Sequence, residues 1–149
     1  YTPIMAIALA GIPLLFFKMK NISWAVLVFV VVNIYVVFSW WCWWYGGGFG
    51  QRPMIDSYII LSIPFALVLD QSKKAGKYFF TGAAIIVFIL LLHNIFQLEK
   101  YKYGSIHFDS MTREAYKRSF FRLHPPDGFY DVIKAPDYEK AVKGIEEYP

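Results

Sequence analysis

The chain has little cysteine and lacks the residue patterns of several enzyme classes. Cys42 is its one cysteine in 149 residues, so an intrachain disulfide is excluded. No set of cysteine, histidine, aspartate and glutamate has metal-ligand spacing, and no catalytic triad pattern is present. No acidic residue lies deep in an apolar run, where an ion-coupled transporter would carry one. These absences disfavour a metalloenzyme, a covalent hydrolase and such a transporter, and no cofactor is expected.

Apolar and aromatic residues are in excess. They make up 57% and 20% of the chain, whereas roughly half of the residues of soluble proteins are apolar. Nearly all the long apolar runs fall in residues 1–98, and residues 99–149 have the composition of soluble sequence. This distribution predicts an all-α, polytopic membrane protein with a transmembrane region at 1–98. Residues 99–149 are expected to form a short helical extramembrane tail.

Four apolar runs predict about four transmembrane helices, because about 20 residues are needed to cross roughly 30 Å of hydrocarbon. We expect these helices at about residues 2–17, 22–44, 53–69 and 78–98. Pro53 suits the first turn of the third helix, and Pro64 is expected to kink it. A polar loop is predicted between the third and fourth helices, at residues 70–77.

Lysines between the apolar runs set the expected orientation. They lie after the first run and between the third and fourth runs, at Lys18, Lys20, Lys73, Lys74 and Lys77. The positive-inside bias makes both loops cytoplasmic. The net charge of +4 therefore reflects membrane topology and not nucleic-acid binding. The loop after the tryptophan-rich end of the second helix and the tail would then lie outside, in periplasm or lumen, in a multi-pass membrane protein.

The chain begins at Tyr1 and passes at once into an apolar run. Neither a basic n-region nor a small-residue cleavage site precedes that run, so a signal peptide is not expected. We therefore expect the chain to be the C-terminal part of a longer polytopic protein, with chemistry-bearing residues upstream.

The tail has signals for two short helices. Asp109 or Ser110 can cap a helix through about Leu123, because either side chain can accept a hydrogen bond from a first-turn N–H group. A turn is predicted at residues 125–128, and Asp137 can cap a last helix through about residue 147. A segment this short is too small for a confident independent core. The tail is expected to pack on the membrane part or on a partner.

The glycine-rich loop after the second run holds the candidate binding residues. Glycines allow a close approach of the backbone to a ligand, and a turn that leads into a helix presents free N–H groups to an anion. An arginine guanidinium is suited to phosphate, and an aspartate could orient it or accept a sugar hydroxyl. The candidate site for a lipid-linked phosphate is Gly46, Gly47, Gly48, Gly50, Gln51, Arg52 and Asp56. The plainer interpretation is a tight reversal, with Arg52 reaching the headgroups and Asp56 favouring a helix N-terminus.

Other polar residues of the apolar runs are expected to serve packing. Asn33 lies near the centre of the second run, where polar side chains usually face other helices. His93, Asn94 and Gln97 cluster near the end of the fourth run, where interfacial hydrogen bonding is the favoured role.

Residues 43–53, with the sequence WWYGGGFGQRP, precede Asp-Ser-Tyr at 56–58 and an apolar helix. This string resembles a loop found late in many bacterial polytopic proteins of the GT-C glycosyltransferase superfamily. The tail sequences HFDSMT at 107–112 and RLHP at 122–125 resemble the C-terminal tails of such proteins in Bacteroidetes. The resemblance implies transfer of a sugar from a polyprenyl-phosphate donor on the external face. It also implies a catalytic carboxylate in an early external loop, so that no catalytic residue is expected in this segment.

Two functional interpretations therefore stay open. In the first, the chain is the C-terminal segment of a lipid-linked sugar transferase, and its loop binds the donor around Gln51, Arg52 and Asp56. In the second, it is a non-catalytic membrane subunit that docks on other subunits of an envelope or secretion complex. Membrane lipid is an expected partner in both, and nucleic acid in neither.

Overall fold

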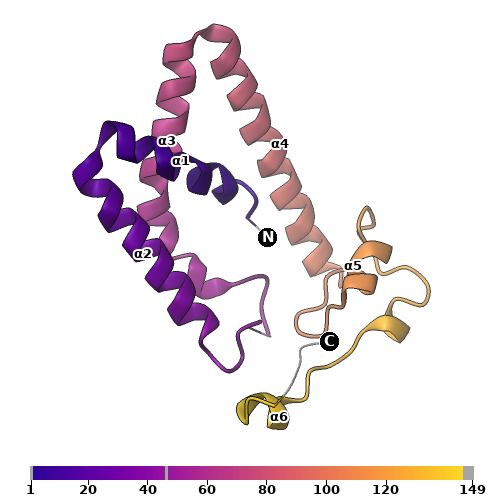
Figure 1. Ribbon diagram of the computed structural model, residues 1–149. Coiled ribbons are helices and arrows are strands. Elements are labelled where there is room, and N and C mark those ends of the chain that lie inside the picture. The colour runs from indigo at the N-terminus through magenta and orange to yellow at the C-terminus, as the bar shows by residue number, and fades with distance from the viewer. Residues whose placement is uncertain (1, 46, 146–149) are drawn as a thin grey trace. The chain divides into compact units, whose positions relative to one another are not determined.

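The computed structural model describes residues 2–45 and 47–145, which form helices and turns without any strand (Figure 1). The predicted all-α class is therefore confirmed for the described chain. In chain order the elements are α1 (Met5–Lys18), α2 (Lys20–Phe38), the 3-10 turn η1 (Arg52–Met54), α3 (Ser57–Ala75), α4 (Lys77–Lys102), α5 (Arg113–Arg118), the 3-10 turn η2 (Tyr130–Val132) and α6 (Tyr138–Val142).

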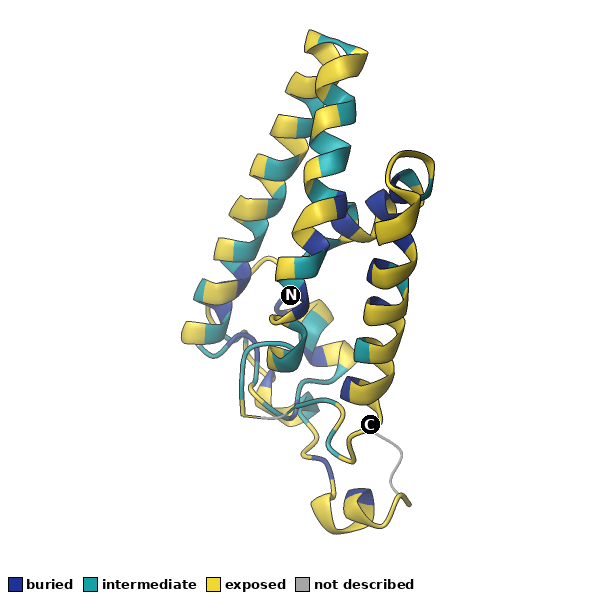
Figure 2. Ribbon diagram, turned by 90° about the vertical axis from the view of Figure 1, so that its left-hand side faces the viewer, coloured by how far each residue is buried: buried dark blue, intermediate teal, exposed yellow. Residues whose placement is uncertain are grey.

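Within the described residues, two helices are long and apolar enough to cross a membrane, fewer than the expected four. They are α2, with 19 residues, and α4, with 26. At about 1.5 Å per residue these lengths correspond to roughly 28 and 39 Å. None of the side chains in the most apolar stretch of α4 is buried, and Figure 2 shows how much of this helix is exposed. The other two apolar runs form α1, which is shorter, and α3, which ends in charged residues.

The ends of two predicted helices were wrong. The second helix stops at Phe38 and not at residue 44, and the tryptophans that follow lie in turns. The third helix extends to Ala75, so the predicted polar loop at residues 70–77 is mostly helical. Asp70 and Lys74 stand one turn apart there and form an ion pair at 2.5 Å, in the favourable order along a helix. The chain turns only at Gly76, whose φ of 122° favours glycine.

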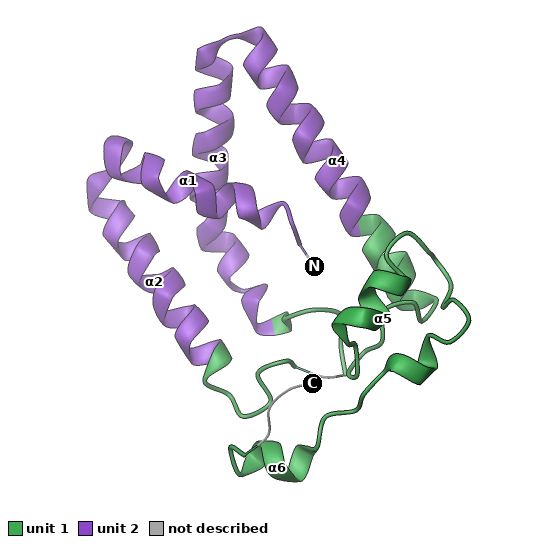
Figure 3. Ribbon diagram, turned by 45° about the vertical axis from the view of Figure 1, so that its right-hand side comes forward, with its two compact units in different colours: residues 1, 38–52, 95–149 green, residues 2–37, 53–94 purple. Residues whose placement is uncertain are grey.

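The described chain forms two compact units that do not follow chain order (Figure 3). Unit 2 contains residues 2–37 and 53–94, and α1 packs on α3 within it. Its core consists of Ala8, Ile12, Leu15, Val26, Val30 and Leu61. Gly11 allows the close approach of α1 to α3, because a Cβ there would lie 2.6 Å from the carbonyl oxygen of Pro64. The packing of α1 thus depends on a missing side chain.

Unit 1 contains residues 38–52 and the described chain from Ile95 onward, so it joins the loop after α2 to the end of α4 and the tail. Phe129 and Ser105 are fully buried in it. The Ser105 hydroxyl donates to the Leu123 carbonyl at 2.7 Å and ties the start of the tail to its middle. The loop and the tail therefore share one packed structure.

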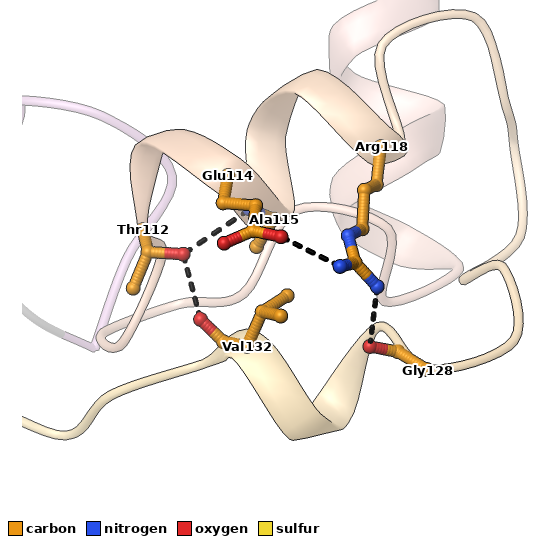
Figure 4. Close-up of polar contacts among 6 residues, drawn as sticks. All are labelled: Thr112, Glu114, Ala115, Arg118, Gly128 and Val132. Carbon is orange, nitrogen blue, oxygen red and sulfur yellow. Dashed lines mark hydrogen bonds and ion pairs between the residues drawn. The ribbon is translucent and has the colours of Figure 1, made fainter.

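The helix caps of the tail were predicted in part. Thr112, and not Asp109 or Ser110, caps α5: its Oγ1 accepts from the Ala115 N–H at 3.1 Å and donates to the Val132 carbonyl at 2.7 Å (Figure 4). The N–H groups of Asp109 and Ser110 instead donate to His107 Nδ1, which holds them in a turn ahead of the helix.

The other two predictions for the tail, a cap at Asp137 and a turn near residues 125–128, agree more closely with the structure. Asp137 caps α6 as predicted, by accepting a hydrogen bond from the Lys140 N–H at 3.1 Å. This helix ends at Val142, earlier than expected, and residue 147 lies outside the described chain. The turn predicted at residues 125–128 forms one residue later, at residues 126–129, where the Phe129 N–H donates to the Pro126 carbonyl at 3.0 Å.

Candidate functional site

The glycine-rich loop closes on itself through two side chains. Gln51 Nε2 donates to the Trp43 carbonyl at 2.5 Å, and Arg52 Nη2 donates to the Gly47 carbonyl at 3.2 Å. Gly47 has a φ of 86°, which favours glycine. At Gly48 an added Cβ would lie 2.7 Å from the guanidinium carbon of Arg52. The loop therefore needs glycine at 47 for its backbone and at 48 for the arginine that lies against it.

The loop also bonds to the tail. The Gly47 N–H donates to the Phe108 carbonyl at 3.2 Å, and Trp44 Nε1 donates to Asp109 Oδ1 at 3.3 Å. The second pair joins residues 65 positions apart in the sequence. These two bonds place the predicted binding loop beside the His107-Phe108-Asp109 segment of the tail.

Between the loop and this segment of the tail lies a cavity of about 240 Å³. Three predicted site residues line it, namely Gly48, Gly50 and Gln51. The other lining residues are Trp43, Trp44, Ile106, His107, Phe108, Asp109 and Met111. The volume is at the small end for ligand sites, which usually measure a few hundred Å³.

The residues that line this cavity include several hydrogen-bond acceptors. Gln51 Oε1 is buried and has no hydrogen-bond partner among the described residues. Asp109 contributes a carboxylate. His107 Nδ1 accepts from the N–H groups of Asp109 and Ser110 at 3.3 and 2.9 Å, so the proton of the neutral ring lies on Nε2. A ligand that supplies hydrogen-bond donors would suit the Asp109 carboxylate of this cavity.

The aromatic ring of Tyr138, in α6, lies beside two tryptophans of the loop. Tyr138 contacts Trp41 edge to face and Trp44 at a tilt, with ring centroids 6.3 and 6.0 Å apart. Burial, and then a hydrogen bond to Asp109 and the charge of that carboxylate, raise the pKa of Tyr138 to about 12. Asp109 therefore interacts with both Trp44 and Tyr138, which fixes its position at the cavity.

Arg52 lies beside the cavity and does not line it. Its side chain is exposed and lies against Gly48, which does line the cavity. A guanidinium has five N–H donors, and the bond to Gly47 uses one of them. Arg52 therefore keeps donors for a second ligand group next to the cavity.

Two predicted site residues do not join this arrangement. Gly46 lies outside the described residues. Asp56 belongs to unit 2, where it precedes the first turn of α3 and makes no side-chain capping bond. The tail residues of the cavity were missed as ligand-binding candidates, because Asp109 had been assigned to a helix cap and His107 lacks a neighbouring metal or acid–base partner in the sequence.

The polar cluster near the end of α4 contributes to packing of the tail. Gln97 is buried, and its Nε2 donates to the Tyr116 hydroxyl at 3.4 Å. Gln97 thus helps to hold the tail, and the interfacial role expected for His93 and Asn94 stays a prediction. In the part of the chain that the structure describes, no group of three or more acidic, histidine or cysteine side chains could hold a metal ion.

Comparison of the chain with protein-family models, curated proteins and solved structures finds no match. The fold and site alone therefore define its class. It is an all-helical protein, and two of its helices could cross a membrane. A small cavity with aromatic and hydrogen-bond acceptor groups lies between its glycine-rich loop and its tail.

Proposed function

We propose that the chain is the C-terminal segment of a membrane glycosyltransferase-like protein that uses a polyprenyl-phosphate-linked sugar on the external face. The observation that carries the proposal is the cavity of about 240 Å³ between loop and tail, with Arg52 beside it. A sugar phosphate needs two adjoining environments, one for an uncharged polyhydroxyl ring and one for an anion.

The cavity suits the sugar ring. Trp43, Trp44 and Phe108 supply aromatic rings to its lining, and sugar hydroxyls can donate to the Asp109 carboxylate. A phosphate inside the cavity would meet the Asp109 carboxylate, and this repulsion favours placing it outside, on Arg52.

The membrane arrangement proposed for the segment has four crossings. Unit 1 contains both the loop that follows α2 and the tail that follows α4, so loop and tail lie on the same side of any membrane. If α4 crosses, the chain between loop and tail must cross twice, and α3 provides the other crossing. The charged end of α3, with Lys73 and Lys74, then lies on the opposite side together with Lys77. By the positive-inside bias that side is cytoplasmic. In a bacterial inner membrane the loop and tail are periplasmic.

This segment binds the donor and does not supply the catalytic carboxylate, which we place outside it. The resemblance of residues 43–53 to a GT-C loop supports this division. Asp56 is kept as a candidate for orienting the donor.

Donor binding to Arg52 is the test. The full chain in detergent is titrated with a polyprenyl-phosphate sugar, and Arg52→Gln is compared with the wild type. Glutamine keeps an amide donor for the Gly47 carbonyl but removes the charge. Charge-assisted hydrogen bonds are worth about 1.5–3 kcal/mol, so we expect affinity to fall about 10- to 100-fold. The matched control is Arg122→Gln, another exposed arginine, and unchanged binding by Arg52→Gln would overturn the anion site.

A non-catalytic subunit is the second candidate, favoured by exposed aromatic side chains of the tail. Phe121 is 86% exposed and Tyr130 66% exposed. Such residues are enriched where proteins bind other proteins. The test is copurification of a membrane partner with the wild type and with Phe121→Ser. A partner that the wild type retains and Phe121→Ser loses, while neither protein binds the donor, would favour this function.

A further inference from the structure

The turn that follows α5 lies beside the end of α4, within unit 1 (Figure 3). Gln97 Nε2 donates to the Tyr116 hydroxyl at 3.4 Å, and Lys100 Nζ donates to the Phe120 carbonyl at 3.1 Å. The Lys100 ammonium also lies 5.8 Å from the ring centroid of Phe96. Because helical side chains point back toward the start of their helix, this ammonium lies one turn before the Lys100 backbone. Phe120 is therefore held at the level of Phe96 along α4.

That level is the border of the apolar stretch of α4. No lysine, arginine, aspartate or glutamate occurs from Tyr78 to Leu98, and Glu99 is the first. The helix is one of the two able to cross a membrane. A crossing helix changes from apolar to charged residues where hydrocarbon gives way to headgroups. In the four-crossing arrangement proposed above, Phe120 therefore lies at this border.

The next residue exposes a large apolar ring at the same border. Phe121 is 86% exposed, and its ring packs edge to face on Phe120, with centroids 4.7 Å apart. A phenylalanine ring gains free energy when it leaves water, and phenylalanine is among the residues with which interfacial segments enter the boundary of headgroups and acyl chains. Arg122, also exposed, limits the depth of the turn, because its charge stays at the level of the headgroups. The chemistry of this turn fits the boundary and not the bilayer centre.

The chain leaves the border directly after this ring. The Leu123 carbonyl accepts from the Ser105 hydroxyl at 2.7 Å, and the Ser105 N–H donates to the Lys100 carbonyl at 2.9 Å. Helix carbonyls point toward the C-terminal end, so Ser105 lies on the side of Lys100 away from the apolar stretch. Phe120 and Leu123 are thus held at two different levels, and Phe121 follows the one nearer the apolar stretch.

We propose that Phe121 anchors the tail to the membrane surface, by inserting its ring between the headgroups and the acyl chains of the bilayer that α4 crosses. Lipid, and not a partner protein, covers the ring, because the bond from Lys100 holds the turn at a level that lipid surrounds. Water still reaches this boundary, so the ring can enter it without burying Arg122. The proposal rests on the crossing of the membrane by α4 and not on sugar transfer.

Lipid crosslinking of the unmodified full chain tests this position. The chain is placed in phosphatidylcholine nanodiscs that contain a phosphatidylcholine with a diazirine near the glycerol end of one acyl chain. After illumination, trypsin separates the segments of interest, which are residues 78–100, 119–122 and 123–134. We expect crosslinks to 78–100, which report the crossing of α4, and several-fold more crosslinks to 119–122 than to 123–134.

The other outcomes of this experiment are distinct. Crosslinks to 78–100 without crosslinks to 119–122 would overturn the anchor and leave the crossing of α4 in place. Crosslinks to neither segment would remove the crossing, and the anchor with it. Neither result bears on donor binding, which Arg52→Gln tests separately.

A spin label measures the depth of the turn directly. A nitroxide is attached at Phe121→Cys or, as the matched control, at Leu123→Cys, an exposed apolar position of the same turn, each in a Cys42→Ser background. Oxygen dissolves in hydrocarbon and a nickel chelate in water, so the ratio of their collision rates should be several-fold higher at residue 121 than at residue 123. Equal ratios would contradict the anchor. If both labels meet the nickel chelate freely, the protein partner considered above accounts better for the exposed ring.

Discussion

Lys100 donates a hydrogen bond from its Nζ to the backbone carbonyl of Phe120 at 3.1 Å, although its side chain is completely buried. The same ammonium lies 5.2 Å from the ring centroid of Tyr116 and 5.8 Å from those of Phe96 and Phe120. Ring faces attract a cation through their quadrupole, which partly replaces lost hydration. The end of α4 is thereby fastened to the tail.

Shortening Lys100 should loosen the tail. Lys100→Ala removes the stem and the ammonium together, and we expect a loss of about 2–5 kcal/mol, as for other large-to-small changes in a core. Lys100→Met keeps the volume, and replacing a buried charge by an apolar group is often tolerated, so its effect should be smaller. Limited proteolysis of the tail measures both. Equal protection of Lys100→Ala and wild type would show that the contact does not hold the tail.

Removing the cap of α5 should open this short helix. Thr112→Ala loses the bond from the Ala115 N–H and the bond to the Val132 carbonyl, and a lost cap typically costs about 1 kcal/mol. Hydrogen exchange at the Ala115 amide should speed up about fivefold. Thr112→Ser is the control, because it keeps the hydroxyl, and it should exchange close to the wild-type rate.

High pH should release Tyr138 from its site. Its folded-state pKa is about 12, above the unfolded value of about 10. The contribution of Tyr138 to stability is therefore complete below pH of about 10 and is lost as the pH rises through about 12. Ultraviolet absorbance of tyrosinate, measured against Tyr138→Phe, isolates this titration. A difference curve centred at the ordinary tyrosine value would show that the contact with Asp109 does not form.

Adding one methyl group to Gly48 should disturb Arg52. The new Cβ would lie 2.7 Å from the guanidinium carbon, so the arginine must move. Gly48→Ala is expected to weaken donor binding several-fold while leaving the helices intact. In the Arg52→Ala background the same change should have little further effect, because both act on one contact. Additive losses in the double variant would separate Gly48 from Arg52.

The four-crossing topology can be tested by cysteine labelling in a Cys42→Ser background. Trp40→Cys in the loop and Phe121→Cys in the tail carry exposed side chains of the same unit, so an impermeant reagent should reach both from one side. Lys74→Cys, exposed near the end of α3, should react only from the other side. Labelling of all three positions from one side would remove α3 and α4 as a pair of crossings.

Hydropathy and local capping rules predicted the parts that depend on neighbours in sequence. The continuous apolar runs gave α2 and α4, and Asp137 caps α6 by a bond that spans three residues. The end of α3 was missed because Asp70 and Lys74 look like loop residues, yet their ion pair suits a helix.

Only the loop half of the candidate site could be predicted from the sequence. The loop contributes Gly48, Gly50 and Gln51, which a glycine-rich pattern indicates. The other half comes from His107, Phe108 and Asp109, far along the chain. No local sequence pattern indicates that the loop lies beside residues 107–109, since this depends on how the ends of α2 and α4 are brought together.

The bond between Trp44 and Asp109 has a consequence for biosynthesis. A ribosome adds about 5–20 residues per second, so the 65 positions between these partners correspond to roughly 3 to 13 seconds of translation. For that interval Trp44 has been made but Asp109, which accepts its indole N–H in the folded protein, has not. The loop and the tail can therefore pack together only after α3 and α4, which separate them in the sequence, have been made.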